Sequence, residues 1–246
     1  MRLNIPFKIM SVYSTIWMRA KARVIVKGLD DVPPREKGER RVYLLLNHST
    51  TFDVVALMHV SKEPFAILMD KGAFTFPIIR HVLKGAGFIP LEKSDSKPAI
   101  EACGRALAEG RPVLISLHDG DSTIGDWGKP RTGGIRLAHL AGAKLYPIFL
   151  KVEDDRIRRL SFKGVNGAEY PYTTFRNTFY FIEFLKPVDL SSLPSDPSYE
   201  NYFEVAKLLD AKAEEVEAIY ENFLSDNRER FAALRRRGGS RLRVAW

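Results

Sequence analysis

The chain has 246 residues, of which 45% are hydrophobic, so it can bury a substantial core as one large domain or two small ones. Its single cysteine, Cys103, excludes an internal disulfide and favours a reducing compartment. The formal charge of +8 is concentrated at the ends, because residues 1–27 and 227–246 each carry +6 and the interior is −4. This distribution predicts contact with an anionic surface, and no helix-turn-helix, zinc or RNA-binding signature indicates nucleic acid.

Residues 1–27 are expected to form an amphipathic helix that associates with a membrane. Their apolar side chains recur at helical spacing, at Ile9, Val12, Tyr13, Ile16 and Trp17. The longest uncharged run, residues 9–18, is ten residues, whereas a helix needs roughly 20 to span a bilayer. The segment also lacks the small-residue cleavage site of a signal peptide. The helix is therefore predicted to lie on the membrane, the alternative being that it packs its apolar stripe on its own domain.

The middle of the chain alternates between strand-like and helix-like segments. The strand-like segments are residues 42–46, 65–69, 87–91, 113–117 and 144–150. The helix-like segments are residues 52–60, 74–84, 98–109 and 134–141. This alternation predicts a single α/β domain over residues 28–190, with a largely parallel mixed sheet covered by helices.

The remainder of the chain completes this organisation. Residues 156–187 are rich in β-branched and aromatic side chains and are expected to add strands at the sheet edge. Residues 191–246 are expected to form a long amphipathic C-terminal helix, over 202–234, followed by a basic tail.

The junction of the first buried strand and the first helix carries two chemically active side chains, in the stretch "LLLNHSTTFDVV". Ser49, Thr50 and Thr51 are good candidates for capping the helix, which places His48 in the turn. Asp53 in the first helical turn can then reach back to an imidazole nitrogen, fix the tautomer and leave the other nitrogen as a base. The alternative is a loop histidine beside a carboxylate that the helix dipole favours.

Further blocks follow in a fixed order, and together they resemble the glycerolipid acyltransferases, the lysophosphatidic acid acyltransferase superfamily. The resemblance covers residues 24–150 and is carried by Asn47-His48 with Asp53, by Lys71 ahead of "FPIIRHVLKGAGFIPLEK", and by residues 133–138 followed by "AGAKLYPIFL". It implies that His48 is the general base and Asp53 its orienting partner. His48 takes the proton from an acceptor hydroxyl as that oxygen attacks a thioester carbonyl, and no covalent acyl-enzyme forms.

The same resemblance implies the acceptor-binding positions, and two blocks depart from the family pattern. Lys93 stands where the family commonly has a phosphate-binding arginine, which keeps the charge but loses the bidentate fork. The third block reads Asp119-Gly120-Asp121-Ser122 in place of Glu-Gly-Thr-Arg, so a cation is missing there. Lys71, Arg131 and Arg136 complete the predicted acceptor-binding set. Unless Arg131 or Arg136 supplies the charge, the acceptor is a related lysolipid, an amino-acid lipid or a glycolipid.

Together with the basic termini, this resemblance implies a peripheral O-acyltransferase of phospholipid biosynthesis on the cytoplasmic face of the cell membrane. Its partners are an anionic membrane surface, a lysolipid acceptor and a donor that is either acyl-coenzyme A or acyl-carrier protein, with no cofactor and no metal. One rival interpretation is a metal-dependent phosphohydrolase that uses His48, Asp53, His118, Asp119 and Asp121 as ligands. The other is a catalytically degenerate membrane-binding module.

Overall fold

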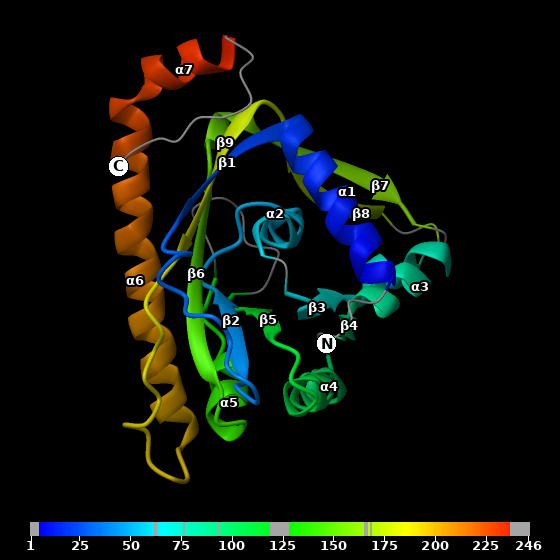
Figure 1. Ribbon diagram of the computed structural model, residues 1–246, viewed down its shortest axis with the longest axis vertical. Helices are drawn as coiled ribbons and strands as arrows, with labels where there is room; N and C mark the ends of the chain where they lie inside the picture. The colour runs from blue at the N-terminus through cyan, green and yellow to red at the C-terminus, as the bar shows by residue number, and fades with distance from the viewer. Residues whose placement is uncertain are drawn as a thin grey trace.

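A seven-stranded sheet forms the centre of the molecule (Figure 1). The computed structural model describes residues 5–61, 63–75, 77–92, 94–118, 128–164, 167 and 169–236. The strand order is β1-β9-β6-β2-β5-β3-β4. These strands are β1 (Ala22–Lys27), β2 (Arg41–Leu45), β3 (Ala66–Asp70), β4 (Phe88–Leu91), β5 (Val113–Ser116), β6 (Lys144–Val152) and β9 (Thr178–Phe184). A separate two-stranded sheet pairs β7 (Ile157–Lys163) with β8 (Glu169–Phe175).

The large sheet is mixed and mostly parallel, as the alternating sequence predicts. β6 and β9 run antiparallel, while each other pair of neighbouring strands is parallel. β2 is buried along its whole length, and in β6 all residues after Lys144 are buried, because helices cover both faces. The carboxyl ends of β2, β5 and β6 therefore meet at one edge of the sheet, where open α/β sheets bind ligands.

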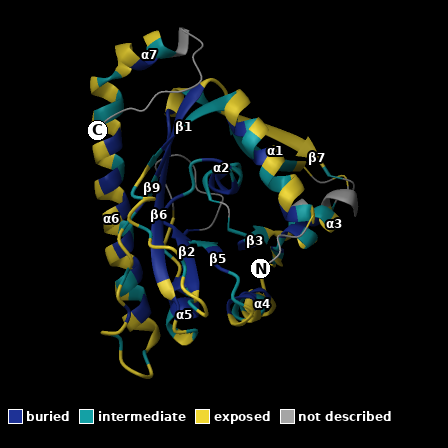
Figure 2. Ribbon diagram, in the orientation of Figure 1, coloured by how far each residue is buried: buried dark blue, intermediate teal, exposed yellow. Residues whose placement is uncertain are grey.

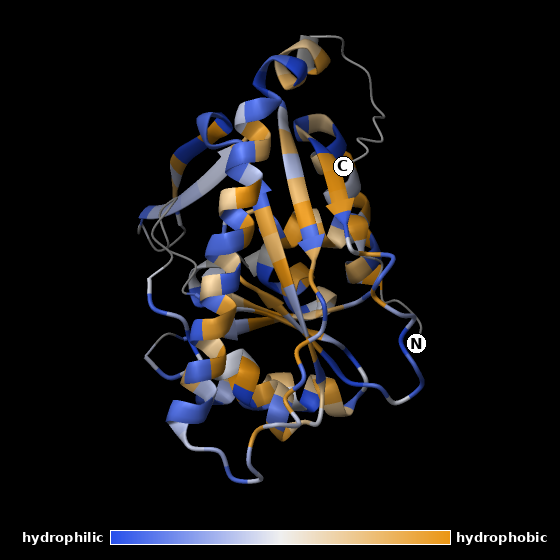
Figure 3. Cartoon of the chain, turned by 90° about the vertical axis from the view of Figure 1, so that its left-hand side faces the viewer, coloured by the Kyte–Doolittle hydropathy of each residue, from blue (hydrophilic) through white to orange (hydrophobic). Residues whose placement is uncertain are grey.

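Two hydrophobic clusters form the core, one on each face of the sheet. One face is covered by α1 (Ile5–Lys21), α2 (Asp53–Val60) and α3 (Pro77–Ala86). The opposite face is covered by α4 (Lys97–Ala108), α5 (Gly133–Leu140), α6 (Tyr199–Asp226) and α7 (Arg228–Arg236). Figure 3 shows hydrophobic residues concentrated in the strands. Along α6, in front of the strands, hydrophobic and hydrophilic residues alternate. Two short 3₁₀ turns, η1 (Lys71–Thr75) and η2 (Asp154–Arg156), follow β3 and β6.

Several elements differ from the sequence-based expectations. The N-terminal helix ends at Lys21, and the next six residues form β1 at the sheet edge, paired in parallel with β9. β9 is an interior strand and β7–β8 a separate sheet, so residues 156–187 do not simply extend the edge. The reason is that β9 is almost entirely buried, whereas β7 is mostly exposed. The C-terminal helix is two helices, which meet at Asn227.

The α1 helix packs one face on the domain and leaves its predicted apolar stripe in solvent. Phe7, Ser14 and Met18 are buried. The opposite side exposes Ile9, Val12, Tyr13 and Ile16, with exposed fractions of 47% to 65% (Figure 2). Trp17, the fifth predicted stripe residue, is half-buried against the domain. Among the helices that the structure describes, none has both the length and the apolar character that a membrane span requires.

Candidate active site

The turn after β2 is anchored to β6 by side-chain and backbone hydrogen bonds. Leu46 N–H donates to the Ile148 carbonyl at 2.9 Å, which continues the ladder past the strand. Asn47 then donates from Nδ2 to the Leu150 carbonyl at 2.6 Å and accepts from Leu150 N–H at 2.9 Å. The Asn47 side-chain amide thus makes the two hydrogen bonds to Leu150 that a backbone residue of a neighbouring strand would make. Because this anchor directly precedes His48, it fixes where the imidazole leaves the sheet.

His48 and Asp53 make the contact that their spacing predicts. His48 lies in the turn, Asp53 is the first residue of α2, and His48 Nδ1 lies 3.0 Å from Asp53 Oδ2. The Asp53 side chain is fully buried, whereas 22% of the His48 side chain is exposed. A carboxylate can only accept a hydrogen bond, so this pairing places the ring proton on Nδ1. Nε2 then carries the lone pair, and it has no hydrogen-bond partner among the described residues.

Asp53 accepts hydrogen bonds from four further groups. The backbone N–H of Ser49 donates to Oδ2 at 2.8 Å, and that of Thr50 donates to Oδ1 at 2.9 Å. The Thr50 hydroxyl adds a bond to Oδ1 at 2.8 Å, and the Tyr180 hydroxyl donates to the same oxygen. The prediction that Ser49, Thr50 or Thr51 caps α2 is therefore wrong. The N-cap of α2 is Phe52, and the Asp53 carboxylate satisfies the free amides of the turn instead.

Tyr180 is the member of this network that sequence reasoning missed. It lies in β9, 127 residues from Asp53, and local spacing carries no signal for a contact over that distance. Burial and the adjacent Asp53 carboxylate raise the pKa of the Tyr180 hydroxyl well above its ordinary value. The hydroxyl therefore stays protonated and donates to Asp53 throughout the physiological pH range.

Two further elements enclose the turn from the side of α1 and β8. Phe52 stacks on Trp17 of α1, with ring centroids 4.2 Å apart, and its edge meets Tyr172 of β8 at 6.4 Å. Two hydrogen bonds join Thr51 to Thr173. The Thr51 backbone N–H donates to the Thr173 hydroxyl at 2.9 Å, and the Thr173 backbone N–H donates to the Thr51 hydroxyl at 3.0 Å. The exposed helix α1 and the β7–β8 hairpin are thus both in contact with the turn that holds His48.

The predicted acceptor-binding residues are less closely grouped than His48 and Asp53. Lys71 opens η1 and pairs with Glu92 at 2.8 Å, with both side chains well exposed. Arg131 is exposed, and its backbone N–H donates to the Leu117 carbonyl at 2.7 Å, which places it at the carboxyl end of β5. Arg136 is exposed on α5, on the sheet face opposite α2. Lys93, Asp119, Gly120, Asp121 and Ser122 lie outside the described residues.

The alternative set of metal ligands is divided between the two faces of the sheet. His118 is 2% exposed, and its Nε2 lies 3.0 Å from Asp210 Oδ1 of α6. Asp53 instead meets Tyr180, which belongs to the cluster under α1 and α2. Within the described part of the chain, no group of three or more His, Cys, Asp or Glu side chains is arranged to hold a metal ion. Asp119 and Asp121 of the proposed set lie outside that part.

Known proteins resemble this chain in both sequence and fold. A 1-acyl-sn-glycerol-3-phosphate acyltransferase of Chlamydomonas reinhardtii is 27% identical over 52% of this chain and 38% of its own length. A protein of that name from Borreliella burgdorferi is 24% identical over 55% of this chain and 54% of its own length. The chain thus spans only about a third to a half of the curated relatives it matches.

The fold has a counterpart in the crystal structure of PlsC from Thermotoga maritima, a 1-acyl-sn-glycerophosphate acyltransferase. The two superpose with a TM-score of 0.58 over 86% of this chain and 80% of that one, at 15% sequence identity. The model of the protein family Acyltransferase matches residues 23–151, which contain His48, Asp53, the strands β2 to β5 and all but the last residue of β6. This match extends over more than half of the chain, and the protein therefore belongs to the Acyltransferase family.

Proposed function

We propose that the protein transfers a fatty acyl group from a thioester donor to the hydroxyl of a lysolipid, with His48 as the general base. One observation supports this proposal above the others. In the His48–Asp53 pair the imidazole is partly exposed, whereas the carboxylate is fully buried and surrounded by hydrogen-bond donors. Such a pair presents one basic nitrogen, Nε2, to a substrate.

The reaction uses that nitrogen twice. Nε2 removes the proton from the acceptor hydroxyl while the oxygen attacks the thioester carbonyl and forms the new C–O bond. Asp53, whose Oδ2 lies 3.0 Å from His48 Nδ1, stabilises the resulting imidazolium. When the tetrahedral intermediate collapses, the C–S bond breaks, and the leaving thiolate takes the proton from Nε2. The products are an ester and a free thiol.

The relatives suggest which acceptor is used. They are named for 1-acyl-sn-glycerol 3-phosphate, so lysophosphatidic acid is the first acceptor to test. Lys93 and Ser122 stand where the family carries arginines, which favours a related lysolipid as the alternative. Acyl-coenzyme A and acyl-carrier protein are both suitable donors, because the chemistry above involves only their shared thioester.

We further propose that α1 holds the enzyme on an anionic membrane as a peripheral protein. The four exposed residues of the predicted stripe are joined by Ile5 at the start of the helix, and the first 27 residues carry six basic and no acidic side chains. Since Trp17 of the same helix stacks on Phe52, the membrane-facing helix lies directly beside the catalytic turn. A lysolipid in the bilayer surface that α1 contacts would then lie close to His48.

The test is a thiol-release assay with acyl-coenzyme A and acyl-carrier protein as donors, against lysophosphatidic acid and lysolipids that lack an exposed phosphate monoester. His48→Ala should lower the rate about 100- to 10,000-fold, the usual contribution of a general base. His139→Ala is the matched control, because its Nδ1 bonds the Tyr202 hydroxyl on the opposite face of the sheet. Wild-type rates in folded His48→Ala would refute the assignment.

A further inference from the structure

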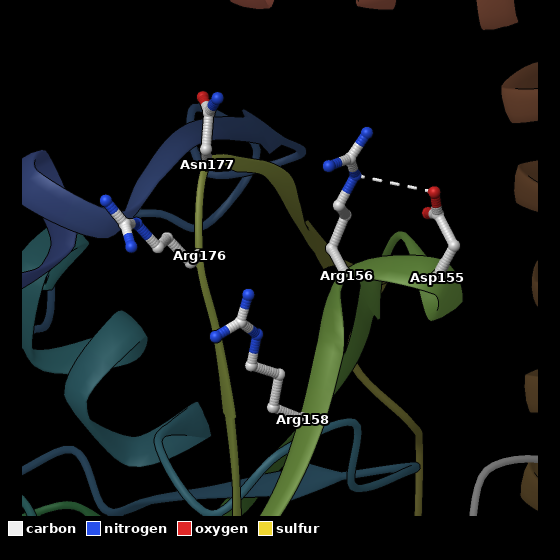
Figure 4. Close-up of a pocket in the computed structure, with 5 residues that line it drawn as sticks. All are labelled: Asp155, Arg156, Arg158, Arg176 and Asn177. Atoms are coloured by element: carbon white, nitrogen blue, oxygen red, sulfur yellow. Dashed lines mark ion pairs between the residues drawn. The ribbon is translucent and has the colours of Figure 1, made fainter.

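A cationic hollow lies at the same edge of the sheet as the catalytic turn, beyond the end of β6. Figure 4 shows that it is lined by Asp155 and Arg156 of η2, Arg158 of β7, and Arg176 and Asn177 of the turn between β8 and β9. Its volume is about 350 Å³. None of these residues belongs to the part of the chain that matches the family, which ends at residue 151.

The charges around this hollow are not balanced by the protein itself. Asp155 lies 3.4 Å from Arg156 Nε, and no ion pair involves Arg158 or Arg176 among the described residues. Three guanidinium groups and one carboxylate leave a net charge of +2. The backbone holds these like charges together, since Asn177 adopts a left-handed φ of 50° in the two-residue turn that carries Arg176. An arrangement of this kind favours an external anion.

Exposed apolar side chains adjoin the hollow on the same strand. Because side chains alternate along a strand, Arg158, Leu160 and Phe162 share one face of β7. Leu160 is 45% and Phe162 39% exposed, and Phe162 stacks on Tyr170 of β8 with centroids 5.5 Å apart. The hairpin is also fixed to the catalytic turn through Thr51 and Thr173. A ligand here would meet cations first and an apolar surface beside them.

We propose that this hollow binds the phosphate of an anionic phospholipid headgroup, as a second membrane contact beside α1. The inference rests on the proposed function, since it adds to the way a peripheral lipid acyltransferase is held at its substrate. Guanidinium groups bind phosphate through paired N–H donors, and Leu160 and Phe162 lie where the glycerol backbone and upper acyl chains would be. The phosphates of coenzyme A share the headgroup's charge, so competition by coenzyme A is one arm of the test below.

The experiment measures binding to phosphatidylcholine vesicles with and without phosphatidylglycerol, using the full chain at low ionic strength. Arg158→Gln with Arg176→Gln should weaken binding to the anionic vesicles about 30-fold, at roughly a factor of five for each cation near the surface. The matched control is Arg159→Gln with Lys163→Gln, which removes two positive charges from the opposite face of β7. The control should lose less than about threefold. All four positions are exposed, and circular dichroism checks that each variant is folded.

Each outcome decides the proposal. Equal losses in both double variants would show diffuse attraction without a site, and unchanged binding of Arg158→Gln with Arg176→Gln would exclude the hollow. Displacement of the wild-type protein from anionic vesicles by coenzyme A, and not by equal inorganic phosphate, would assign the hollow to a soluble donor and overturn the lipid proposal. Failure of the proposed function is a separate result, because wild-type protein would then release no thiol from either thioester donor.

Discussion

At the scale of single residues, the Asp53 carboxylate is the centre of the site. Burial of an ionised group is unfavourable unless hydrogen bonds replace its water, and here five donors from the turn, from His48 and from β9 do so. The carboxylate therefore has one orientation, and so has the imidazole that contacts it. Tyr180 is a positioning residue in this arrangement, because it acts on His48 only through Asp53.

Tyr180→Phe should lower both stability and turnover. The loss of a hydrogen bond to a buried carboxylate should reduce the free energy of unfolding by about 1.5 to 3 kcal/mol. The same loss lets the Asp53 carboxylate, and the imidazole that it orients, adopt other positions, so kcat/KM for thiol release should fall. Urea denaturation and thiol-release kinetics measure the two effects.

Tyr220→Phe is the control for this substitution, because the Tyr220 hydroxyl donates to Glu183 at 3.0 Å on the far side of the sheet. It should lose comparable stability and keep the wild-type kcat/KM. A purely structural role for Tyr180 would give the same result in both variants.

At the scale of secondary-structure elements, α1 and α6 show how two amphipathic helices differ in their exposed faces. Both expose large apolar side chains, such as Ile16 at 65% in α1 and Leu208 at 71% in α6. Their charges are opposite, because α1 contains only basic ionisable groups apart from Tyr13, whereas α6 has eight acidic and two basic residues. Of these two helices, α1 is therefore the one suited to an anionic surface.

Ile9→Asp with Ile16→Asp should release the protein from anionic vesicles. Each substitution removes an apolar side chain worth about 1.5 to 3 kcal/mol on burial, so binding should weaken at least about 100-fold. Vesicle flotation measures the loss. Deletion of the helix is less informative, since Phe7, Ser14 and Met18 are buried and their removal would expose the core.

The control changes two equally exposed residues of α6, Leu208→Asp with Ile219→Asp. Binding of this variant should match that of the wild type. If the α1 variant also floats with the vesicles, the stripe on α1 is not a membrane contact.

At the scale of the whole molecule, a buried ion pair and the proposed active site lie at opposite ends of β2. The strand starts at Arg41, which is 2% exposed and donates two hydrogen bonds to Glu39, at 3.0 and 2.9 Å. Lys144 at the start of β6 adds a second cation 3.3 Å from the same carboxylate. Burial raises the pKa of Glu39, but the hydrogen bonds and charge of Arg41 outweigh it and lower the pKa to about 2.

This pair should make the protein sensitive to acid. A carboxyl pKa lower in the folded state than its ordinary 4.5 contributes stability that is fully present above that value and is lost as the pH falls toward 2. Glu39→Gln should therefore lower the free energy of unfolding at pH 7 by on the order of 2 kcal/mol, with the two curves converging between pH 5 and 2. Urea titrations across this range measure it.

Glu92→Gln is the appropriate comparison, because Glu92 pairs with Lys71 at 2.8 Å but is 49% exposed. Exposed pairs contribute little, so this variant should be close to the wild type at every pH. Parallel curves for Glu39→Gln and the wild type would remove Glu39 as the source of acid sensitivity.

The sequence by itself determined the elements and the pair whose members are close along the chain. Alternation of apolar segments located β2 to β6 and α2 to α5 within a few residues, because that pattern reflects local backbone geometry and burial. The contact of His48 with Asp53 could be read from one strand-to-helix turn, since Asp53 follows His48 by only five positions. The basic, amphipathic N-terminus was likewise visible in local composition.

Only the tertiary structure decided which distant segments meet. The placement of β9 between β1 and β6, the Tyr180 hydroxyl on Asp53, and the grouping of Arg156, Arg158 and Arg176 around one hollow all join residues through sheet pairing and turns. Strand order depends on which buried faces complement each other across the whole core, and local propensity carries no information about that choice. The reach of the site beyond His48 and Asp53 is therefore a property of the folded chain.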